Sequence, residues 1–173
     1  MTQPVGALLQ FAYVVPDIEK TLKYWTEVLG VGPFFMFERM ELVGHKFRGT
    51  PTRPNLALAL ANSGEAQIEI IMQNNDEPSV YKEFADAGGF GLHHVGYTPR
   101  NFDAEIAKYE GLGCERALEG SLPGGTRVAY MDTREQLGHL TEFWEETEEL
   151  MTLFHRVEGA SKNWDGSDPV RLL

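Results

Sequence analysis

The sequence has 173 residues, of which 42% are hydrophobic and 24% are charged, a composition that indicates a folded chain with a real core and excludes disorder. Acidic residues outnumber basic ones 26 to 15, giving a formal net charge of -11, which argues against a nucleic-acid partner. The single cysteine, Cys114, excludes a disulfide framework or a multi-cysteine zinc site within one chain. No apolar run approaches the roughly 20 residues of a membrane span, and residues 1–7 lack a signal-peptide pattern, so we expect a cytoplasmic protein.

The first half of the chain predicts one helix among several strands. Asp17 is placed to cap the helix, apolar residues then recur at helical spacing, and Gly30 closes it. The segment 49–54 contains Gly, Thr and two prolines and predicts a turn. The expected strands cover residues 8–15, 34–47, 55–61 and 66–72, with the helix between the first two.

The second half repeats this order after a short predicted helix at 79–87. Asn101 is placed to cap the next helix, and a final helix is expected over 146–157. The tail from Ser161 is rich in Gly, Asp and Pro and is expected to lie on the surface. The expected strands cover residues 92–98, 115–118, 127–131 and 138–145.

A repeat at a spacing of 84 residues organises the chain. Gln10-Phe11-Ala12-Tyr13 aligns with His94-Val95-Gly96-Tyr97, and each copy continues into a capped helix closed by Leu-Gly. The sequence therefore predicts an α+β protein built from two tandem βαβββ units. The expected divisions are 7–75 for the first unit, 76–90 for a linker helix, 91–145 for the second unit and 146–173 for a C-terminal helix and tail.

Strand alternation places one polar residue and one carboxylate of each unit on matching faces. The pairs are Gln10 with Glu69 and His94 with Glu142. Carboxylates flanked by apolar strand residues are costly to bury unless they are paired. A divalent cation would satisfy all four groups at once, and imidazole with several oxygens suits Zn²⁺, Ni²⁺, Co²⁺, Fe²⁺ or Mn²⁺.

Other residues near this face receive weaker assignments. Ala12 and Gly96 follow on the same face, and their small side chains are expected to leave space for a ligand beside the metal. By alternation His93 points to the opposite face and is expected to pack or form hydrogen bonds there. His45 and Glu41 lie on a strand that could rim the site. A local cluster of basic residues could bind a carboxylate or phosphate, but the same residues could equally form ordinary solvated surface. The cluster consists of Arg39, Lys46, Arg48 and Arg53.

These residues carry a resemblance to the vicinal oxygen chelate superfamily, which includes glyoxalases, bleomycin resistance proteins and extradiol dioxygenases. The resemblance covers about residues 7–145. Its segments are Gln10-Phe11-Ala12-Tyr13-Val14-Val15-Pro16-Asp17, Gln67-Ile68-Glu69-Ile70-Ile71, Gly91-Leu92-His93-His94-Val95-Gly96-Tyr97 and His139-Leu140-Thr141-Glu142-Phe143. The fold it implies is a curled mixed β-sheet cup with helices outside, in which the first and last strands of each unit hold a divalent metal.

The resemblance implies Gln10, Glu69, His94 and Glu142 as the metal ligands. The ligand set is similar to that of some glyoxalase I enzymes, whereas the layout is closer to methylmalonyl-CoA epimerase. The chain departs from the epimerase pattern by carrying Gln10 in place of a histidine and Glu69 in place of a glutamine. The resemblance implies an isomerase, epimerase or lyase. In such an enzyme the metal polarises a substrate carbonyl, and Glu142 and Glu69 move a proton at the adjacent carbon.

Two other functions stay open at this stage. An extradiol-type dioxygenase shares the fold, but Gln10 replaces the first histidine of its iron site. A metal-free protein that sequesters a small molecule is a different class, and the complete ligand set argues against it. The expected partner is a small molecule with a carbonyl or vicinal oxygens, and a homodimer is possible in this fold.

Overall fold

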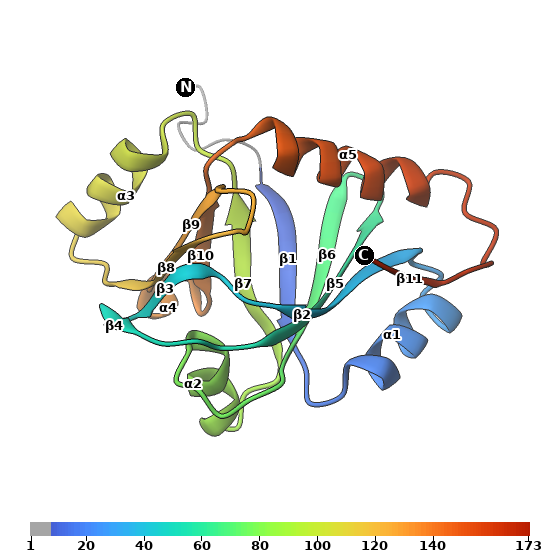
Figure 1. Cartoon of the computed structure of the whole chain (residues 1–173), viewed down its shortest axis with the longest axis horizontal. Coiled ribbons are helices and arrows are strands. Elements are labelled where there is room, and N and C mark those ends of the chain that lie inside the picture. The colour runs from blue at the N-terminus through green and yellow to red at the C-terminus, as the bar shows by residue number, and fades with distance from the viewer. Residues whose placement is uncertain (1–7) are drawn as a thin grey trace.

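The computed structural model describes residues 8–173. Residues 1–7, in which the sequence shows no signal-peptide pattern, lie outside the described part. The described chain forms one eleven-stranded mixed sheet that curls into an open cup, with helices packed around it (Figure 1). The predicted α+β class with a curled mixed sheet is confirmed.

The strands follow one another across the sheet in an order that mixes the two halves of the chain. That order is β11-β2-β5-β6-β1-β7-β10-β9-β8-β3-β4. The strands are β1 (Leu8–Val14), β2 (Phe34–Met40), β3 (Val43–Phe47), β4 (Thr50–Pro51), β5 (Leu56–Ser63), β6 (Ala66–Gln73), β7 (Gly91–Tyr97), β8 (Arg116–Ser121), β9 (Arg127–Met131), β10 (Leu140–Trp144) and β11 (Val170–Leu172). The helices are α1 (Ile18–Glu27), α2 (Val80–Asp86), α3 (Phe102–Gly111), α4 (Arg134–Leu137) and α5 (Glu148–Ser161).

The centre of the sheet joins the two repeated halves. β1 pairs with β6 in parallel and with β7 antiparallel, and β7 pairs with β10 in parallel. The first and last long strands of each repeat thus stand side by side at the deepest part of the cup. Residues on the inner face of these four strands must therefore lie close together.

One strand prediction is wrong because it ignored long-range pairing. The expected strand over 34–47 is two strands: β2 pairs with β5, whereas β3 pairs with β8 on the far side of the cup. Residues 41–42 carry the chain between the two, so a continuous apolar pattern hides a crossing from one half to the other. The tail from Ser161 lies at the surface, as expected, and it adds β11, an unpredicted edge strand that runs parallel to β2.

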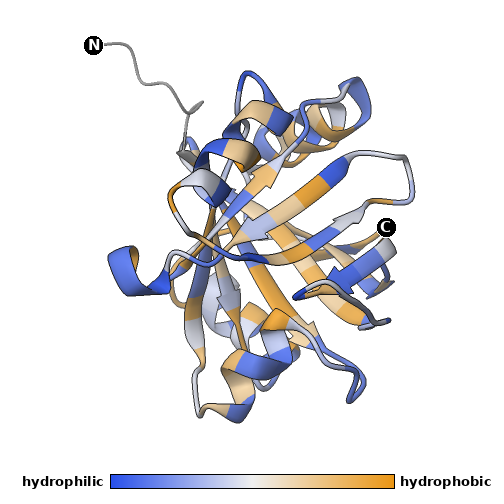
Figure 2. Ribbon diagram, turned by 90° about the vertical axis from the view of Figure 1, so that its left-hand side faces the viewer, coloured by the Kyte–Doolittle hydropathy of each residue, from blue (hydrophilic) through white to orange (hydrophobic). Residues whose placement is uncertain are grey.

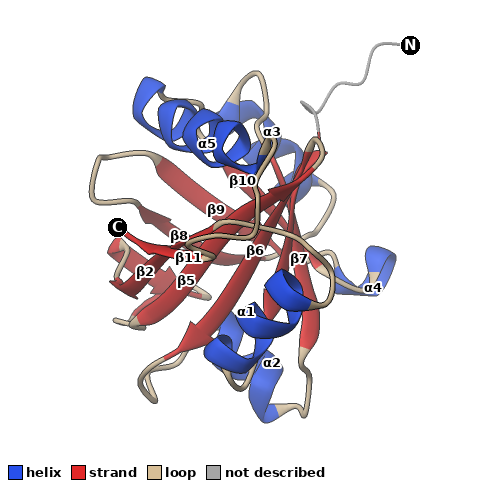
Figure 3. Ribbon diagram, turned by 90° about the vertical axis from the view of Figure 1, so that its right-hand side faces the viewer, coloured by secondary structure: helices blue, strands red, loops and turns tan. Residues whose placement is uncertain are grey.

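The helices α1 and α3 begin at the predicted caps. The Asp17 side chain accepts a hydrogen bond from the Lys20 backbone N–H at 2.9 Å, and Asn101 accepts one from Ala104 at 3.0 Å. These caps satisfy N–H groups that have no partner within the helix. Both helices pack on the outer surface of the sheet, α1 against the β1–β6 half (Figure 3) and α3 against β9.

The inner face of the cup forms the largest apolar cluster. It contains Ala12 and Val14 of β1 together with apolar residues of β5, β8, β9 and β10, and α5 contributes Leu150 and Val157. In Figure 2 the hydrophobic colour is concentrated along the strands, whereas the helices carry both hydrophobic and hydrophilic residues. In the described residues, none of the helices has the length and apolar character to cross a membrane.

Candidate metal centre and its cavity

Two small residues bring the four predicted ligands together. Ala12 is paired with Glu69 across β6 and with His94 across β7. Gly96 is likewise paired with Gln10 across β1 and with Glu142 across β10. Because directly paired residues in a sheet share a face, two adjacent rows each carry two of the four side chains.

The four side chains converge on one point in the interior. His94 Nε2 lies 3.2 Å from Glu69 Oε2 and 3.1 Å from Glu142 Oε2. His94 is completely buried, and Gln10, Glu69 and Glu142 are each at most 6% exposed. Two carboxylates at this depth require a positive partner, because an uncompensated buried charge is strongly destabilising.

Gln10 lies against both carboxylates. One end of its side-chain amide is 3.1 Å from Glu69 Oε2 and 3.2 Å from Glu142 Oε2, and the other end is 2.7 Å from Gln67 Oε1. With the nitrogen donating to Gln67, the Gln10 oxygen faces two carboxylate oxygens, an arrangement that a cation stabilises. With the amide turned over, its nitrogen donates to both carboxylates. The amide can therefore act as a metal ligand or as a hydrogen-bond donor.

The electrostatics of the cluster favour a cation at its centre. Burial lowers the pKa of His94, but the attraction and hydrogen bonds of Glu142 and Glu69 outweigh it and raise that pKa to about 9. Burial also raises the pKa of the Glu69 carboxyl, against the opposing effect of its hydrogen bond from His94. Without a metal, a proton on His94 supplies the positive charge, and a divalent ion would replace it.

The donor set fits a divalent transition metal. Metal–ligand bonds of 2.0–2.2 Å place neighbouring ligand atoms about 2.8–3.6 Å apart in octahedral or tetrahedral geometry. The contacts of His94 and Gln10 with the two carboxylates, at 3.1–3.2 Å, lie within that range. Ligand atoms of Glu69, His94 and Glu142 all lie within 4.8 Å of one another.

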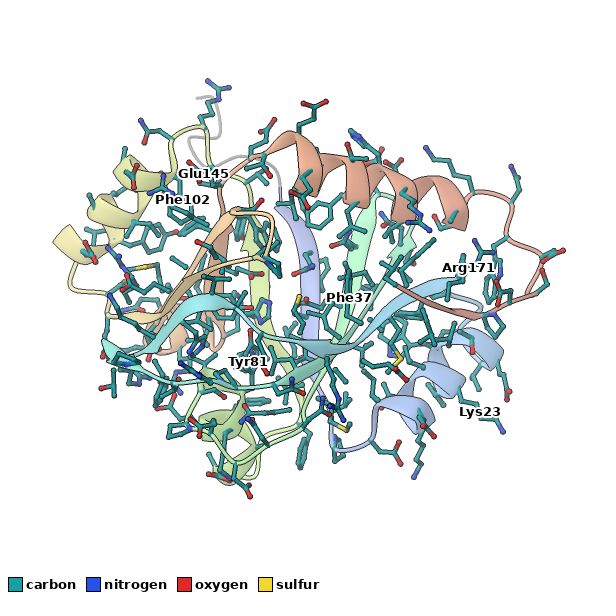
Figure 4. All side chains as sticks on the ribbon, viewed as in Figure 1. Lys23, Phe37, Tyr81, Phe102, Glu145 and Arg171 are labelled. Carbon is teal, nitrogen blue, oxygen red and sulfur yellow. The ribbon has the colours of Figure 1, made fainter. Side chains whose placement is uncertain are left out.

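A cavity of about 450 Å³ opens above this centre. Gln10, Glu69 and Glu142 reach into it, whereas His94 lies below its floor. Its wall is largely apolar and includes residues from β2, β5, the β8–β9 turn and α5, namely Phe37, Leu58, Leu60, Leu122, Leu153 and Phe154. Phe37 and Tyr81 are seen in the middle of the cup, while Lys23 and Arg171 lie at its periphery (Figure 4). The cavity is of a size that accepts a small organic molecule.

Two tyrosines that the sequence analysis did not select also line the cavity. Tyr130 Oη lies 3.3 Å from His94 Nε2 and 2.9 Å from Tyr81 Oη. Burial and the nearby Glu142 hold the pKa of both hydroxyls well above the usual value, so they remain neutral donors. Tyr130 is paired with Glu142 across β9 and β10, a relation that strand alternation could have suggested.

Two sequence expectations about this face are wrong. A β-bulge in β7 opposite Ala12 turns His93 towards His94, so His93 does not lie on the opposite face. The space expected beside Gly96 is filled, because the indole of Trp144 lies directly against it. The open volume next to the centre therefore lies towards Tyr130 and the apolar wall.

The contact between Trp144 and Gly96 leads to a prediction about the stability of the protein. A Cβ added at Gly96 would collide with the indole, so Gly96→Ala is expected to lower the free energy of unfolding by about 1–3 kcal/mol. The control is Gly111→Ala at the end of α3, where an added Cβ meets nothing within 4 Å. Urea denaturation compares the two, and equal midpoints would show that Trp144 can move aside at no cost.

The residues expected at the rim of the site and the expected cluster of basic residues differ in how they are placed. Glu41 lines the cavity and accepts a hydrogen bond from Asn55, whereas buried His45 is bound to Thr52 through Nδ1 and does not line it. The basic cluster does not form: Lys46 pairs with Glu119, and Arg48 binds three carboxylates. Those three are Glu83, Glu115 and Asp132. From that cluster, Arg39 lines the cavity.

Comparison with known proteins gives one family-model match and several solved structures with a similar fold. A family model described as the glyoxalase/bleomycin resistance protein/dioxygenase superfamily matches residues 9–130. No curated protein matches the sequence significantly. A hypothetical protein, BH1468 from Bacillus halodurans C-125, is 20% identical with a TM-score of 0.61, over 82% of this chain and 95% of that chain.

Two other solved structures with this fold are methylmalonyl-CoA epimerases. The enzyme from Mycobacterium tuberculosis is 19% identical with a TM-score of 0.60, over 88% of this chain and 95% of that chain. One solved in complex with methylmalonyl-CoA and NH4+ is 14% identical with a TM-score of 0.54, over 83% of this chain and 96% of that chain. At these identities the likeness establishes the fold. The homodimer and the cytoplasmic location stay predictions from the sequence.

Proposed function

The chain belongs to the glyoxalase/bleomycin resistance protein/dioxygenase superfamily, and on that basis we propose that it is a divalent-metal-dependent isomerase, epimerase or lyase. Its reaction would be a proton transfer at the carbon next to a carbonyl of a small oxygenated substrate. The observation that carries the proposal is the convergence of Gln10, Glu69, His94 and Glu142 at the floor of an apolar cavity.

In this proposal the four converging side chains hold the ion. When bound, a divalent metal would polarise a carbonyl oxygen and so acidify the adjacent C–H. The candidates are Zn²⁺, Ni²⁺, Co²⁺, Mn²⁺ and Fe²⁺, which accept mixed imidazole and oxygen ligands. His94 supplies the nitrogen, while Gln10 and the two glutamates supply oxygens.

The two glutamates would also move the proton. Both carboxylates reach the cavity and approach the same point from different halves of the sheet. In this proposal a substrate carbon held above that point would meet Glu69 from the β6 side and Glu142 from the β10 side. One carboxylate removing the proton and the other returning it would invert the carbon, as an epimerase requires.

The cavity wall supports an oxygenated substrate with an apolar part. Leucine and phenylalanine side chains line the wall beside the carboxylates, and an apolar lining of this kind strengthens charge interactions by lowering the local dielectric constant. The hydroxyls of Tyr81 and Tyr130 stand within the same cavity as neutral donors, and they could orient substrate oxygens. The methylmalonyl-CoA epimerases among the structural neighbours suggest a branched acyl thioester as the first probe.

Solvent exchange tests the proposed reaction. The protein is loaded with Zn²⁺, Co²⁺ or Ni²⁺ and incubated in D2O with methylmalonyl-CoA or with a 2-hydroxy ketone, and loss of the C2 proton signal is followed by NMR. We expect exchange that chelator abolishes and added metal restores. Metal-loaded protein that exchanges no proton in either probe class would contradict the proposal, and oxygen uptake with catechol would point to a dioxygenase instead.

A metal-free binding protein is the second candidate, and one observation favours it. With His94 protonated and the amides of Gln10 and Gln67 both turned, all four polar groups find hydrogen-bond partners without an ion. The cavity could then bind a small molecule with no chemistry. Metal analysis of protein purified without added metal separates the candidates, because the binding protein should contain far less than one ion per chain.

Metal binding should depend steeply on pH. Because the carboxylates raise the pKa of His94 to about 9, a proton must leave the imidazole before the metal can bind at neutral pH. The apparent affinity should therefore rise roughly tenfold per pH unit between pH 6.5 and 8.5. Calorimetry in two buffers of different ionisation enthalpy should show about one proton released per Zn²⁺, and an affinity that is flat over this range would oppose the assignment.

A further inference from the structure

His93 forms a hydrogen-bonded bridge between a helix and the candidate metal ligand. The β7 bulge places His93 beside its neighbour, with Nδ1 of His93 2.9 Å from Nδ1 of His94. Its other nitrogen, Nε2, lies 3.2 Å from the backbone carbonyl oxygen of Val80, the first residue of α2. His93 is 3% exposed and packs against the rings of Tyr81 and Phe84.

The partners of His93 determine which of its nitrogens carries the proton. A backbone carbonyl can only accept, so Nε2 of His93 must be the N–H that donates to Val80. The ring is 3% exposed and enclosed by the aromatic rings of Tyr81 and Phe84, surroundings in which a charged imidazolium is costly and the neutral ring is favoured. A neutral imidazole has one N–H, and Nδ1 of His93 is therefore an acceptor.

That acceptor fixes the state of His94 in turn. Nδ1 of His94 must donate the hydrogen bond that joins the two rings. When His94 gives up its second proton, the lone pair is left on Nε2, the atom directed at the Glu69 and Glu142 carboxylates. Without this acceptor, the neutral ring could carry its proton on Nε2, where it would block a metal.

We propose that His93 is a positioning residue that holds His94 in the tautomer and ring orientation that bind the metal through Nε2. The proposal rests on the proposed metal centre and adds a second histidine and α2 to it. Groups that hydrogen-bond to a metal-binding histidine commonly change metal affinity 10–100-fold when they are removed. Here the supporting group is another imidazole, and it is tied to the helix that follows the first repeat.

Two variants separate hydrogen bonding from packing at this position. His93→Phe keeps an aromatic ring between Tyr81 and Phe84 but has no acceptor for His94. His93→Gln loses the ring but keeps an amide that can accept and donate. The control is His45→Phe, because His45 is equally buried at 4% exposure and lies outside the centre.

The affinities of wild type and variants are measured by titrating Zn²⁺ into metal-free protein against a chelating indicator. His93→Phe is expected to bind Zn²⁺ about 10–100-fold more weakly, His93→Gln to lose less, and His45→Phe to bind as wild type does. Equal affinity in wild type and His93→Phe would overturn the proposal. If wild type itself binds no Zn²⁺, the proposed function fails, and the positioning role fails with it.

A second measurement needs no variant. Long-range ¹H–¹⁵N correlation spectra of metal-free wild type, labelled at histidine, report the protonated nitrogen of each ring. His93 is expected as a neutral imidazole with its proton on Nε2. A proton on Nδ1 of His93 would overturn the positioning role even if the protein binds metal, so this failure is distinct from failure of the proposed function.

Discussion

Replacing Glu142 with glutamine is expected to slow solvent exchange at the substrate carbon by about 10²–10⁴-fold, the usual contribution of a positioned acid–base group. The glutamine has nearly the same shape and retains an oxygen ligand, but it cannot take up the proton. Glu142 lies 3.1 Å from His94 and reaches the cavity, so the variant changes the chemistry at the point where the substrate is expected to bind.

The design of this experiment separates proton transfer from metal loss. Exchange is measured by NMR in D2O with saturating metal, and the metal content of each sample is determined in parallel. The control is Glu41→Gln, which alters a carboxylate in the same cavity outside the centre and should leave exchange nearly unchanged. Unchanged exchange in Glu142→Gln would remove Glu142 from the role of base.

The partner variant tests the two-base form of the mechanism. If Glu142 removes the proton and Glu69 returns it from the other side, Glu69→Gln should slow inversion of the carbon more than it slows exchange of one stereoisomer. Equal loss of both would instead indicate that one carboxylate serves both steps.

Replacing His94 with alanine is expected to have the second large effect, on metal binding and on stability. The change removes the nitrogen ligand and leaves Glu69 and Glu142 buried without their partner. Breaking a buried ion pair costs about 3–5 kcal/mol. We expect a loss near the lower end, about 3 kcal/mol, because Glu69, whose pKa is already raised by burial, can take up a proton.

The pH dependence of His94→Ala follows from that proton. A carboxyl group whose pKa is raised by folding destabilises the protein once the pH exceeds the pKa of that group in the unfolded chain. The variant should therefore lose more stability at pH 8 than at pH 5. Urea denaturation with chelator present measures both. Exposed His155→Ala is the control and should stay within about 0.5 kcal/mol of wild type. A His94→Ala protein as stable as wild type at pH 8 would show that the carboxylates need no cation.

Much of the candidate site could be predicted because strands have a period of two. Alternation placed Gln10 and Glu69 on one face, and the repeat directed attention to His94 and Glu142 at matching positions. The structure brings these four side chains together. Their role as metal ligands remains a proposal.

Features that depend on pairing between distant segments could not be predicted in the same way. The bulge that turns His93 inward arises from the register of β7 against β1, and nothing in the local pattern marks it. The same is true of the split between β2 and β3, since each strand finds its partner on a different side of the cup. Tyr81 was missed because it lies on the helix between the repeats, outside the alternating strands.

The most direct test of the central claim is X-ray anomalous diffraction from protein crystallised after purification without added metal, together with its elemental analysis. The account predicts one transition-metal ion per chain, with an anomalous peak about 2.0–2.2 Å from His94 Nε2 and from oxygens of Gln10, Glu69 and Glu142. Protein that contains no such ion and takes up none from solution, or an ion bound elsewhere, would contradict it.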